Sequence, residues 1–418
     1  MNSPTASGGS SVIDRSREIE VFQLAARTDL SESGGQSLDD LMTGTIDWDY
    51  ILSVGGLHGV LPLMQVHLGQ REEVPAAVRQ ALQGRCERVV RSNLYLSSRL
   101  VEIADALDGA GVSNLALKGP AVAATLYGNQ FLREFGDIDI LVRSEDIAHA
   151  TRVVESLGFV PWQSLSGAQE ELLPHVEYSR TFTRPSDDLD LDLHWDLARS
   201  FFRGRIEAES LWAETASFDL HGRELRCLPP DLLLMALCVH GGKHGPFPWP
   251  RLKWVCDVAE FVRRSETFDW EAALLRAGEL GCRRSTLVGL ALSRSLLDHE
   301  LPPPVTEALA SERQVVILAR KIWAWLSSDA PVSLSFSEHV VVDLTLIDGS
   351  AGRWTYAIRR ILTPTKKDWG SRTLPRYLGF LYVPLRIARL AGQYVPRPWR
   401  LRHLLRSDVS RSPGDPPS

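Results

Sequence analysis

Two short acidic segments carry the residue types best suited to chemistry. The first, Asp137-Ile138-Asp139-Ile140-Leu141-Val142, alternates carboxylates with aliphatic side chains. On a β-strand, alternate side chains point to opposite faces, so Asp137 and Asp139 share one face while Ile138 and Ile140 face the core. Neighbouring carboxylates repel each other unless a cation lies between them. The pattern therefore predicts a site for Mg²⁺, which proteins usually hold through one or two carboxylates together with substrate phosphates.

The second segment, Asp190-Leu191-Asp192-Leu193-His194-Trp195, repeats this alternation. If the two strands are neighbours, Asp192 reaches the same metals and helps to activate an attacking hydroxyl. His194 lies on the same face and is a candidate for binding the substrate. The alternative is that both strands are solvated outer faces of a half-buried sheet. We favour the metal site because a turn with lysine and glycine precedes the first segment.

That turn, Lys118-Gly119, separates a predicted strand at 115–117 from a predicted helix at 121–127. A glycine there lets the backbone approach a phosphate, and the start of a helix favours an anion. Lys118 and Arg133, the latter in the loop before Asp137, would add positive charge for triphosphate oxygens. Lys118, Gly119 and Arg133 are therefore the candidate nucleotide-binding residues. The alternative is an ordinary solvated lysine beside a common strand-to-helix turn.

Together these segments resemble a bacterial nucleotidyltransferase family with an LKG turn, a divergent branch of the DNA polymerase β-like superfamily. The resemblance spans roughly residues 94–270 and rests on Leu117-Lys118-Gly119-Pro120-Ala121, Leu126-Tyr127-Gly128, Arg133, Gly136-Asp137-Ile138-Asp139-Ile140-Leu141-Val142, Asp192-Leu193-His194-Trp195, Leu232-Leu233, His240, His244, Arg251-Leu252-Lys253-Trp254 and Asp257.

The resemblance implies a metal-dependent enzyme that moves a nucleoside monophosphate from a nucleoside triphosphate (NTP) to a hydroxyl acceptor. Mg²⁺ or Mn²⁺ would be the cofactor. Asp137 and Asp139 match the metal ligands of the family, Asp192 its third carboxylate, and Gly119 the glycine of the nucleotide-binding turn.

One departure from the wider superfamily concerns the residue after that glycine. The superfamily has Gly-Ser or Gly-Gly in the turn, whereas this chain has Pro120, which offers no backbone donor. The proline makes Lys118 the more interesting residue of the turn. It also favours an alternative in which the chain is a non-catalytic nucleotide sensor or a membrane-associated partner. A third interpretation, transfer of the γ-phosphate, predicts a nucleoside diphosphate as the product.

A polar segment, His240-Gly241-Gly242-Lys243-His244-Gly245, follows an apolar helix. Lys243 and His244 are predicted to face phosphate or acceptor. A zinc site at His240 and His244 is disfavoured because no HExxH glutamate accompanies them. The alternative is that these are ordinary capping and loop residues, with Asp257 in a structural ion pair with Arg251 or Lys253.

The chain as a whole predicts an α+β protein with a small mixed sheet and flanking helices. We expect disorder at 1–15 and 407–418, an N-terminal helical region at 16–110, a nucleotidyltransferase core at 111–228, and a helical region with a basic tail at 229–406. The clearest helix is Val78–Leu107. A helix at 145–157 has Ser144 as its expected N-cap and Gly158 after its end. Further strands are expected at 177–183, 189–195 and 223–228.

Composition limits the remaining choices. The five cysteines form no CxxC pair and indicate neither a disulfide framework nor a zinc ribbon, which favours a cytoplasmic location. We expect no signal peptide and no transmembrane span. Residues 351–418 carry 14 Lys and Arg against 3 Asp and Glu, whereas the first 350 residues have a net charge of −17. The basic segment 377–390 is expected to pack on this acidic body in preference to an anionic membrane surface, and no nucleic acid is expected as a partner.

Overall fold

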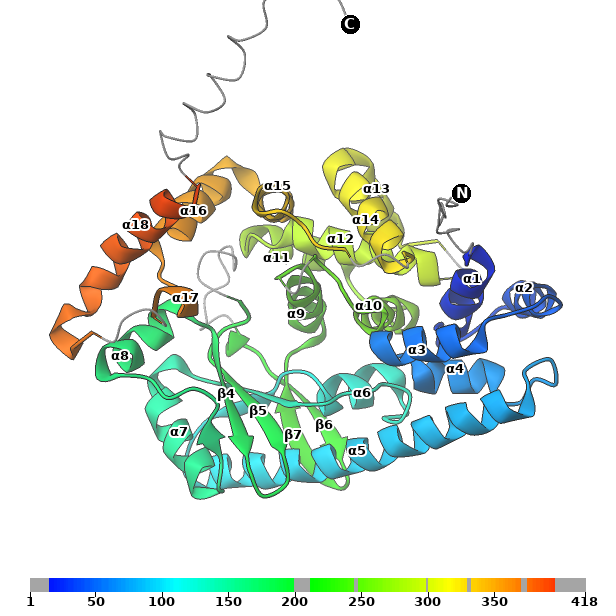
Figure 1. The fold of residues 1–418 in the computed structure, drawn as a ribbon, viewed down its shortest axis with the longest axis horizontal. Coiled ribbons are helices and arrows are strands. Elements are labelled where there is room, and N and C mark those ends of the chain that lie inside the picture. The colour runs from blue at the N-terminus through cyan, green and yellow to red at the C-terminus, as the bar shows by residue number, and fades with distance from the viewer. Residues whose placement is uncertain are drawn as a thin grey trace, which may run out of the picture.

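The computed structural model describes residues 15–198, 211–243, 247–297, 300–328, 332–369 and 374–394. A single mixed sheet lies between two groups of helices. In Figure 1 the long helix α5 passes below the sheet, and the C-terminal helices lie above it. This arrangement confirms the predicted α+β class. Of the segments expected to be disordered, 1–15 and 407–418, all but Arg15 lie outside the described ranges, and Arg15 forms an ion pair of 3.3 Å with Asp47.

The N-terminal helices precede the sheet in the chain. They are α1 (Ser16–Ala25), α2 (Glu32–Met42), α3 (Trp48–His58), α4 (Leu61–Leu68) and α5 (Ala76–Gly109). The side chains of Ser31 and Asp47 accept hydrogen bonds from the free backbone N–H groups at the starts of α2 and α3. The helix predicted at Val78–Leu107 is confirmed as α5. It ends before Gly111, whose φ of +74° is incompatible with a continued helix.

The strands of the described chain form one seven-stranded sheet in the order β3-β4-β5-β2-β1-β7-β6. Their bounds are β1 (Asn114–Ala116), β2 (Ile138–Val142), β3 (Val160–Pro161), β4 (Ser179–Arg184), β5 (Leu189–His194), β6 (Ala216–Leu220) and β7 (Arg223–Cys227). β1 pairs antiparallel with β2 and parallel with β7, while β2 and β5 run parallel. The short helices α6 (Pro120–Tyr127), α7 (Ile147–Ser156) and α8 (Gly167–Val176) connect the strands.

One face of the sheet is apolar, as the alternation in the sequence predicts. Ile138 and Ile140 of β2 and Leu191 and Leu193 of β5 are fully buried in a cluster that also takes in residues of α5 and α7. The opposite face carries a polar ladder, in which Thr183 lies opposite Asp190, Thr181 opposite Asp192 and Ser179 opposite His194. The sheet therefore buries its aliphatic side chains and presents its carboxylates on the other face.

Several local predictions can be compared with these elements. Gly158 follows α7 with a φ of +87°, as expected for a residue that ends a helix. Ser144 is not an N-cap, because a single 3₁₀ turn (Ser144–Asp146) precedes α7 and Asp146 stands at the N-cap position. Strand β6 was not predicted, although the turn that joins it to β7, His221-Gly222, has two positive φ values, as two-residue hairpin turns require.

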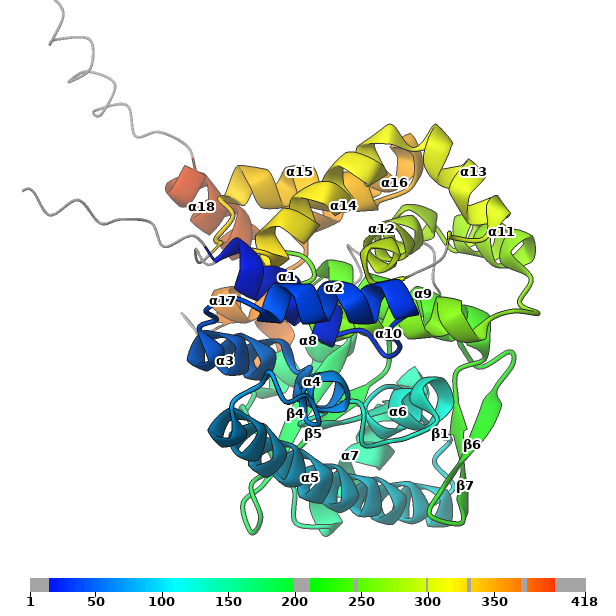
Figure 2. The same cartoon turned by 90° about the vertical axis from the view of Figure 1, so that its right-hand side faces the viewer.

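The C-terminal helices stack above the sheet. They are α9 (Pro230–Lys243), α10 (Leu252–Arg264), α11 (Trp270–Glu279), α12 (Arg283–Ser293), α13 (Pro303–Ser311), α14 (Arg313–Leu326), α15 (Phe336–Leu346), α16 (Gly349–Leu362), α17 (Lys366–Trp369) and α18 (Tyr382–Tyr394), with 3₁₀ turns at Arg294–Leu296 and Arg376–Leu381. Figure 2 shows α1 and α2 lying alongside this group, and Gln23 of α1 donates a hydrogen bond of 2.6 Å to Ser327, the residue that follows α14.

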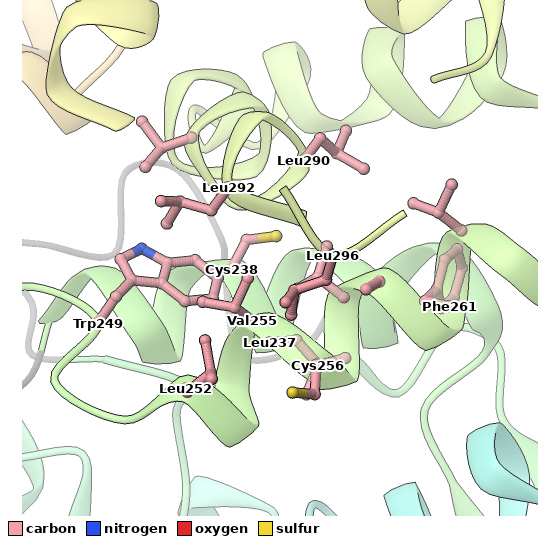
Figure 3. Close-up of a cluster of buried hydrophobic side chains, with 14 of the residues drawn as sticks. Leu237, Cys238, Trp249, Leu252, Val255, Cys256, Phe261, Leu290, Leu292 and Leu296 are labelled. Atoms are coloured by element: carbon pink, nitrogen blue, oxygen red, sulfur yellow. The ribbon is translucent and has the colours of Figure 1, made fainter. Parts of the chain in front are cut away.

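Trp249 is one of the largest fully buried side chains of the main apolar core. Its fully buried indole is surrounded by side chains of α9, α10 and α12, including Cys238, Leu252 and Leu292 (Figure 3). Gly241 of α9 and Gly289 of α12 make room for it, because a Cβ at either position would lie 3.0 Å or less from the indole. The two glycines thus allow the helices to close on one large aromatic side chain.

The basic segment packs against its own protein. Tyr382 of α18 is fully buried, and Arg386 and Arg389 bind the two carboxylate oxygens of Asp368 at 2.8 and 2.6 Å. Within the described residues, no helix combines the length and apolar character that a membrane crossing needs.

Candidate active site

The parallel ladder between β2 and β5 brings the two predicted acidic segments together. Asp139 lies opposite Asp192 in this ladder, and Leu141 lies opposite His194. Among the described residues, Asp139, Asp192 and His194 form a cluster whose potential ligand atoms all lie within 4.8 Å of one another. The distance is short enough for one cation to contact all three side chains.

Asp139 is the most constrained residue of the cluster. Its side chain is 4% exposed, and its Oδ1 accepts hydrogen bonds from Lys118 Nζ at 2.6 Å and His194 Nε2 at 2.7 Å. Burial alone would raise the pKa of this carboxyl, but the charge of Lys118 and the hydrogen bond from His194 outweigh burial and hold the pKa well below its usual range. Asp139 is therefore a buried carboxylate. This excludes, for Asp139, the alternative that its strand face is exposed to solvent.

His194 is buried and neutral in character. Burial lowers its pKa, although the hydrogen bond to Asp139 opposes this effect. A neutral imidazole has one N–H, and the bond to Asp139 places it on Nε2. The Nδ1 lone pair is then buried without a hydrogen-bond partner in the described chain. One nitrogen of this ring is thus open to a ligand on the polar side of the sheet.

The other two aspartates differ in exposure. Asp192 is partly buried, and its Oδ1 accepts a hydrogen bond of 2.6 Å from Thr181 on the neighbouring strand. Asp137 directly precedes β2, is exposed, and lies outside the cluster of ligand atoms. The like charge of Asp139, with a smaller contribution from desolvation of the carboxyl by the surrounding protein, nevertheless raises the pKa of Asp137 to about 6. The two carboxylates of the DxD segment therefore repel each other electrostatically.

The turn at Gly119 has the geometry that the sequence suggests. Gly119 is the N-cap of α6 with a φ of +54°, and a Cβ there would lie 3.4 Å from the carbonyl oxygen of Asp137. Pro120 occupies the first position of α6, where a proline fits because the N–H of that residue has no partner within the helix. The turn therefore brings the start of α6 beside the acidic segment.

The guanidinium of Arg133 is bonded outside the acidic cluster. Its buried guanidinium donates two hydrogen bonds, of 2.7 and 2.8 Å, to the carboxylate of Asp257 in α10, and Tyr127 donates a third to the same carboxylate. The alternative had paired Asp257 with Arg251 or Lys253, but its partner in the structure is Arg133. Lys253 instead donates to the backbone carbonyl of Glu134 at 3.2 Å. These contacts fasten the loop before Asp137 to the C-terminal helices.

Lys243 enters the site region from the end of α9. Its ammonium donates to the carbonyl oxygen of Leu197 and lies 3.9 Å above the ring of Tyr178. Burial and the nearby charge of Lys118 hold the pKa of Lys243 well below its ordinary value. Since the ring of Tyr178 lies 5.7 Å from that of His194, Lys243 is a near neighbour of the acidic cluster. His244 lies outside the described residues.

The family of the chain follows from its sequence. A model of a family described as uncharacterised nucleotidyltransferases matches residues 44–298, which is more than half of the chain. The chain belongs to this family. The matched residues include the sheet, the acidic cluster and helices α9 to α12.

Two further comparisons with known proteins add little to this result. A crystal structure of an antigenic nucleotidyltransferase-like protein from Paracoccidioides brasiliensis is similar over 50% of this chain and 95% of that chain, with 15% sequence identity and a TM-score of 0.30. A TM-score of this size does not establish a common fold. Among curated proteins, none matches the chain significantly.

The donor atoms of this cluster fit a divalent cation. Carboxylate oxygens suit Mg²⁺ and Mn²⁺, whereas an imidazole nitrogen beside them is more typical of transition metals. The buried Asp139 also needs a positive partner, and Lys118 is the one that contacts it. Asp139 and Asp192 with His194 therefore form a candidate metal centre, next to the turn that begins α6.

Sequence reasoning missed two features of this site. Thr181 was not singled out, although its place opposite Asp192 follows once the hairpin of β4 and β5 is in register. The role of His194 as a partner of Asp139 was also missed, since the histidine was assigned to substrate alone. Its position two residues after Asp192 on the same strand face was the available signal.

Proposed function

We propose that the protein is a metal-dependent nucleotidyltransferase that moves a nucleoside monophosphate from an NTP to a hydroxyl acceptor. The observation that carries this proposal is the parallel register that sets Asp139 opposite Asp192, with His194 completing a set of donors within 4.8 Å. Membership in a nucleotidyltransferase family supports the same chemistry. In this proposal Asp137 joins Asp139 and Asp192 in holding Mg²⁺ or Mn²⁺. His194, a member of the donor cluster, lies with Lys243 on its acceptor side.

The proposed reaction is an in-line displacement at the α-phosphorus. The acceptor oxygen attacks this phosphorus, the bond to the β-phosphate oxygen breaks, and pyrophosphate leaves. Asp192 orients the acceptor hydroxyl and takes its proton, while the turn at Gly119 and the charge of Lys118 hold the phosphates. A bound divalent cation would supply charge neutralisation for the phosphoryl oxygens. We do not assign Arg133 to the triphosphate, because its guanidinium already has two bonds to Asp257.

A second candidate, a nucleotide-binding module without catalysis, is favoured by one observation. Pro120 leaves the turn without one backbone donor, and Lys118, the nearest cation to the turn, is already paired with Asp139. Such a module would bind NTP in a metal-dependent manner and would not turn it over. Turnover is therefore the measurement that separates the two candidates.

The experiment is pyrophosphate release from ATP, GTP, CTP and UTP with Mg²⁺ or Mn²⁺, in the presence of a mixture of hydroxyl-bearing metabolites. Asp139→Asn and Asp192→Asn should abolish the release. Asp190→Asn is the matched control, because Asp190 lies on the same face of β5 but is exposed and bonded to Thr183. Metal-dependent NTP binding without any release would favour the non-catalytic module. Equal release by Asp139→Asn and the wild type would exclude the proposed centre.

A further inference from the structure

Lys118 lies between the acidic cluster and the start of α6. Its ammonium is 2.6 Å from Asp139 Oδ1, and its side chain is only 14% exposed. The next residue, Gly119, is the N-cap of α6. The same side chain thus stands beside the strongest candidate metal ligand and beside the turn proposed to hold phosphate.

We propose that Lys118 and a divalent cation compete for Asp139, so that metal binding releases the lysine to bind the triphosphate. This inference rests on the proposed function of the site. It adds an order of binding, in which the metal binds first and frees Lys118 beside the nucleotide-binding turn. Lys118 is then the residue that couples the two binding events.

Competition follows from the contacts of Asp139. Its Oδ1 already accepts hydrogen bonds from Lys118 and from His194, so this oxygen has little capacity left for a third partner. A cation that coordinates Asp139 would also stand beside the ammonium, and like charges repel strongly in a buried site. A cation held by Oδ2 instead would still share this carboxylate with the ammonium, so the two positive groups compete for Asp139. Lysine can move away because its ammonium sits on a flexible four-carbon chain.

The released ammonium has a suitable destination close by. The start of a helix attracts anions, and Pro120 removes one of the backbone donors that the turn would otherwise offer. A lysine one residue before Gly119 replaces that donor with a full charge. Coupling of this kind is reciprocal, so nucleotide should also strengthen metal binding. Without the lysine, metal should strengthen nucleotide binding less, and nucleotide should strengthen metal binding less.

The first test is Mn²⁺ binding to the full chain without nucleotide, followed by electron paramagnetic resonance. Lys118→Met and Lys118→Gln should bind Mn²⁺ at least about fivefold more tightly than the wild type, the lower end of typical coupling between sites. Lys118→Arg, which keeps the charge, should bind as the wild type does. Lys253→Met is the control for loss of a nearby positive charge, because Lys253 bonds to Glu134 and not to Asp139. Its affinity should change less than that of Lys118→Met.

The second test uses the unaltered protein. Acetic anhydride should modify Lys118 slowly when no metal is added, faster with Mn²⁺, and slowly again when a non-hydrolysable NTP analogue is added, as measured by mass spectrometry. Mn²⁺ affinity that is unchanged or lower in both neutral variants would overturn the inference, as would acetylation that Mn²⁺ does not accelerate. Mn²⁺ binding that persists in Asp139→Asn would instead remove the metal centre, and with it the proposed function.

Discussion

Asp139 of β2 and Asp192 of β5 lie directly opposite each other in a parallel ladder. Parallel neighbours place side chains of paired residues on the same face of a sheet, so the two carboxylates converge although they are far apart in the chain. Each also has a hydrogen-bond partner in this structure, Lys118 for Asp139 and Thr181 for Asp192. The carboxylates are thus held in place by the protein itself.

The ion pair of Arg133 and Asp257 should be important for stability. Asp257→Asn or Arg133→Met leaves a buried charge without its partner and should lower the free energy of unfolding by about 3–5 kcal/mol. The double variant Arg133→Met/Asp257→Leu should recover much of this loss, because neither charge remains. Urea denaturation followed by circular dichroism measures the loss in the single variants and the recovery in the double variant. A loss below about 1 kcal/mol in the single variants, combined with weaker NTP binding in Arg133→Met, would return Arg133 to the phosphate site.

The packing around Trp249 predicts opposite effects at two helical glycines. In Gly241→Ala the new Cβ would lie 2.5 Å from the indole, so overpacking should cost about 1–3 kcal/mol. Gly84 lies inside α5 with open space where a Cβ would point, and Gly84→Ala should stabilise the protein by about 0.5–1 kcal/mol. Thermal unfolding of the two variants gives the comparison. A stabilising Gly241→Ala would show that the indole can move.

His58 should make the stability of the protein depend on pH. Burial and the charge of Arg251 lower its pKa from 6.5 to about 4, and its Nδ1 accepts a hydrogen bond from the backbone N–H of Leu252. The folded state binds this proton less readily than the unfolded state. Neutral His58 therefore makes its full contribution to the free energy of unfolding above about pH 6.5. This contribution, up to about 3 kcal/mol, is lost as the pH falls towards 4.

Urea midpoints at pH 7.5 and pH 5 test this dependence. His58→Gln should remove most of the difference, because the amide oxygen of glutamine can accept the same hydrogen bond and does not titrate. An identical pH dependence in the wild type and in His58→Gln would assign it to other groups.

Much of the fold around the site could be predicted from local patterns. The alternation of aspartate with aliphatic residues predicts the buried strands β2 and β5, and helical periodicity predicts α5. Pairing between distant residues could not be predicted in the same way. Arg133 was assigned to phosphate because it is a cation in a loop before Asp137. Its partner Asp257 lies 124 residues further along the chain, where no periodic signal connects the two.

For the site, the sequence predicted which residues take part better than it predicted which of them contact one another. Lys118 was expected at phosphate, and in the structure it binds Asp139. Nothing in the local sequence distinguishes these two partners, because a lysine before a turn can reach either side. The distinction depends on the distance between β1 and β2, which only the folded sheet defines.

The most direct test of the central claim follows the label of an NTP. The full chain is incubated with Mn²⁺, hydroxyl-bearing metabolites and NTP labelled at the α- or the γ-phosphate, beside Asp139→Asn. The proposed function predicts that the α-label enters a new product and the γ-label appears in pyrophosphate, in the wild type alone. Transfer of the γ-label with formation of a nucleoside diphosphate, or equal transfer by Asp139→Asn, would contradict it.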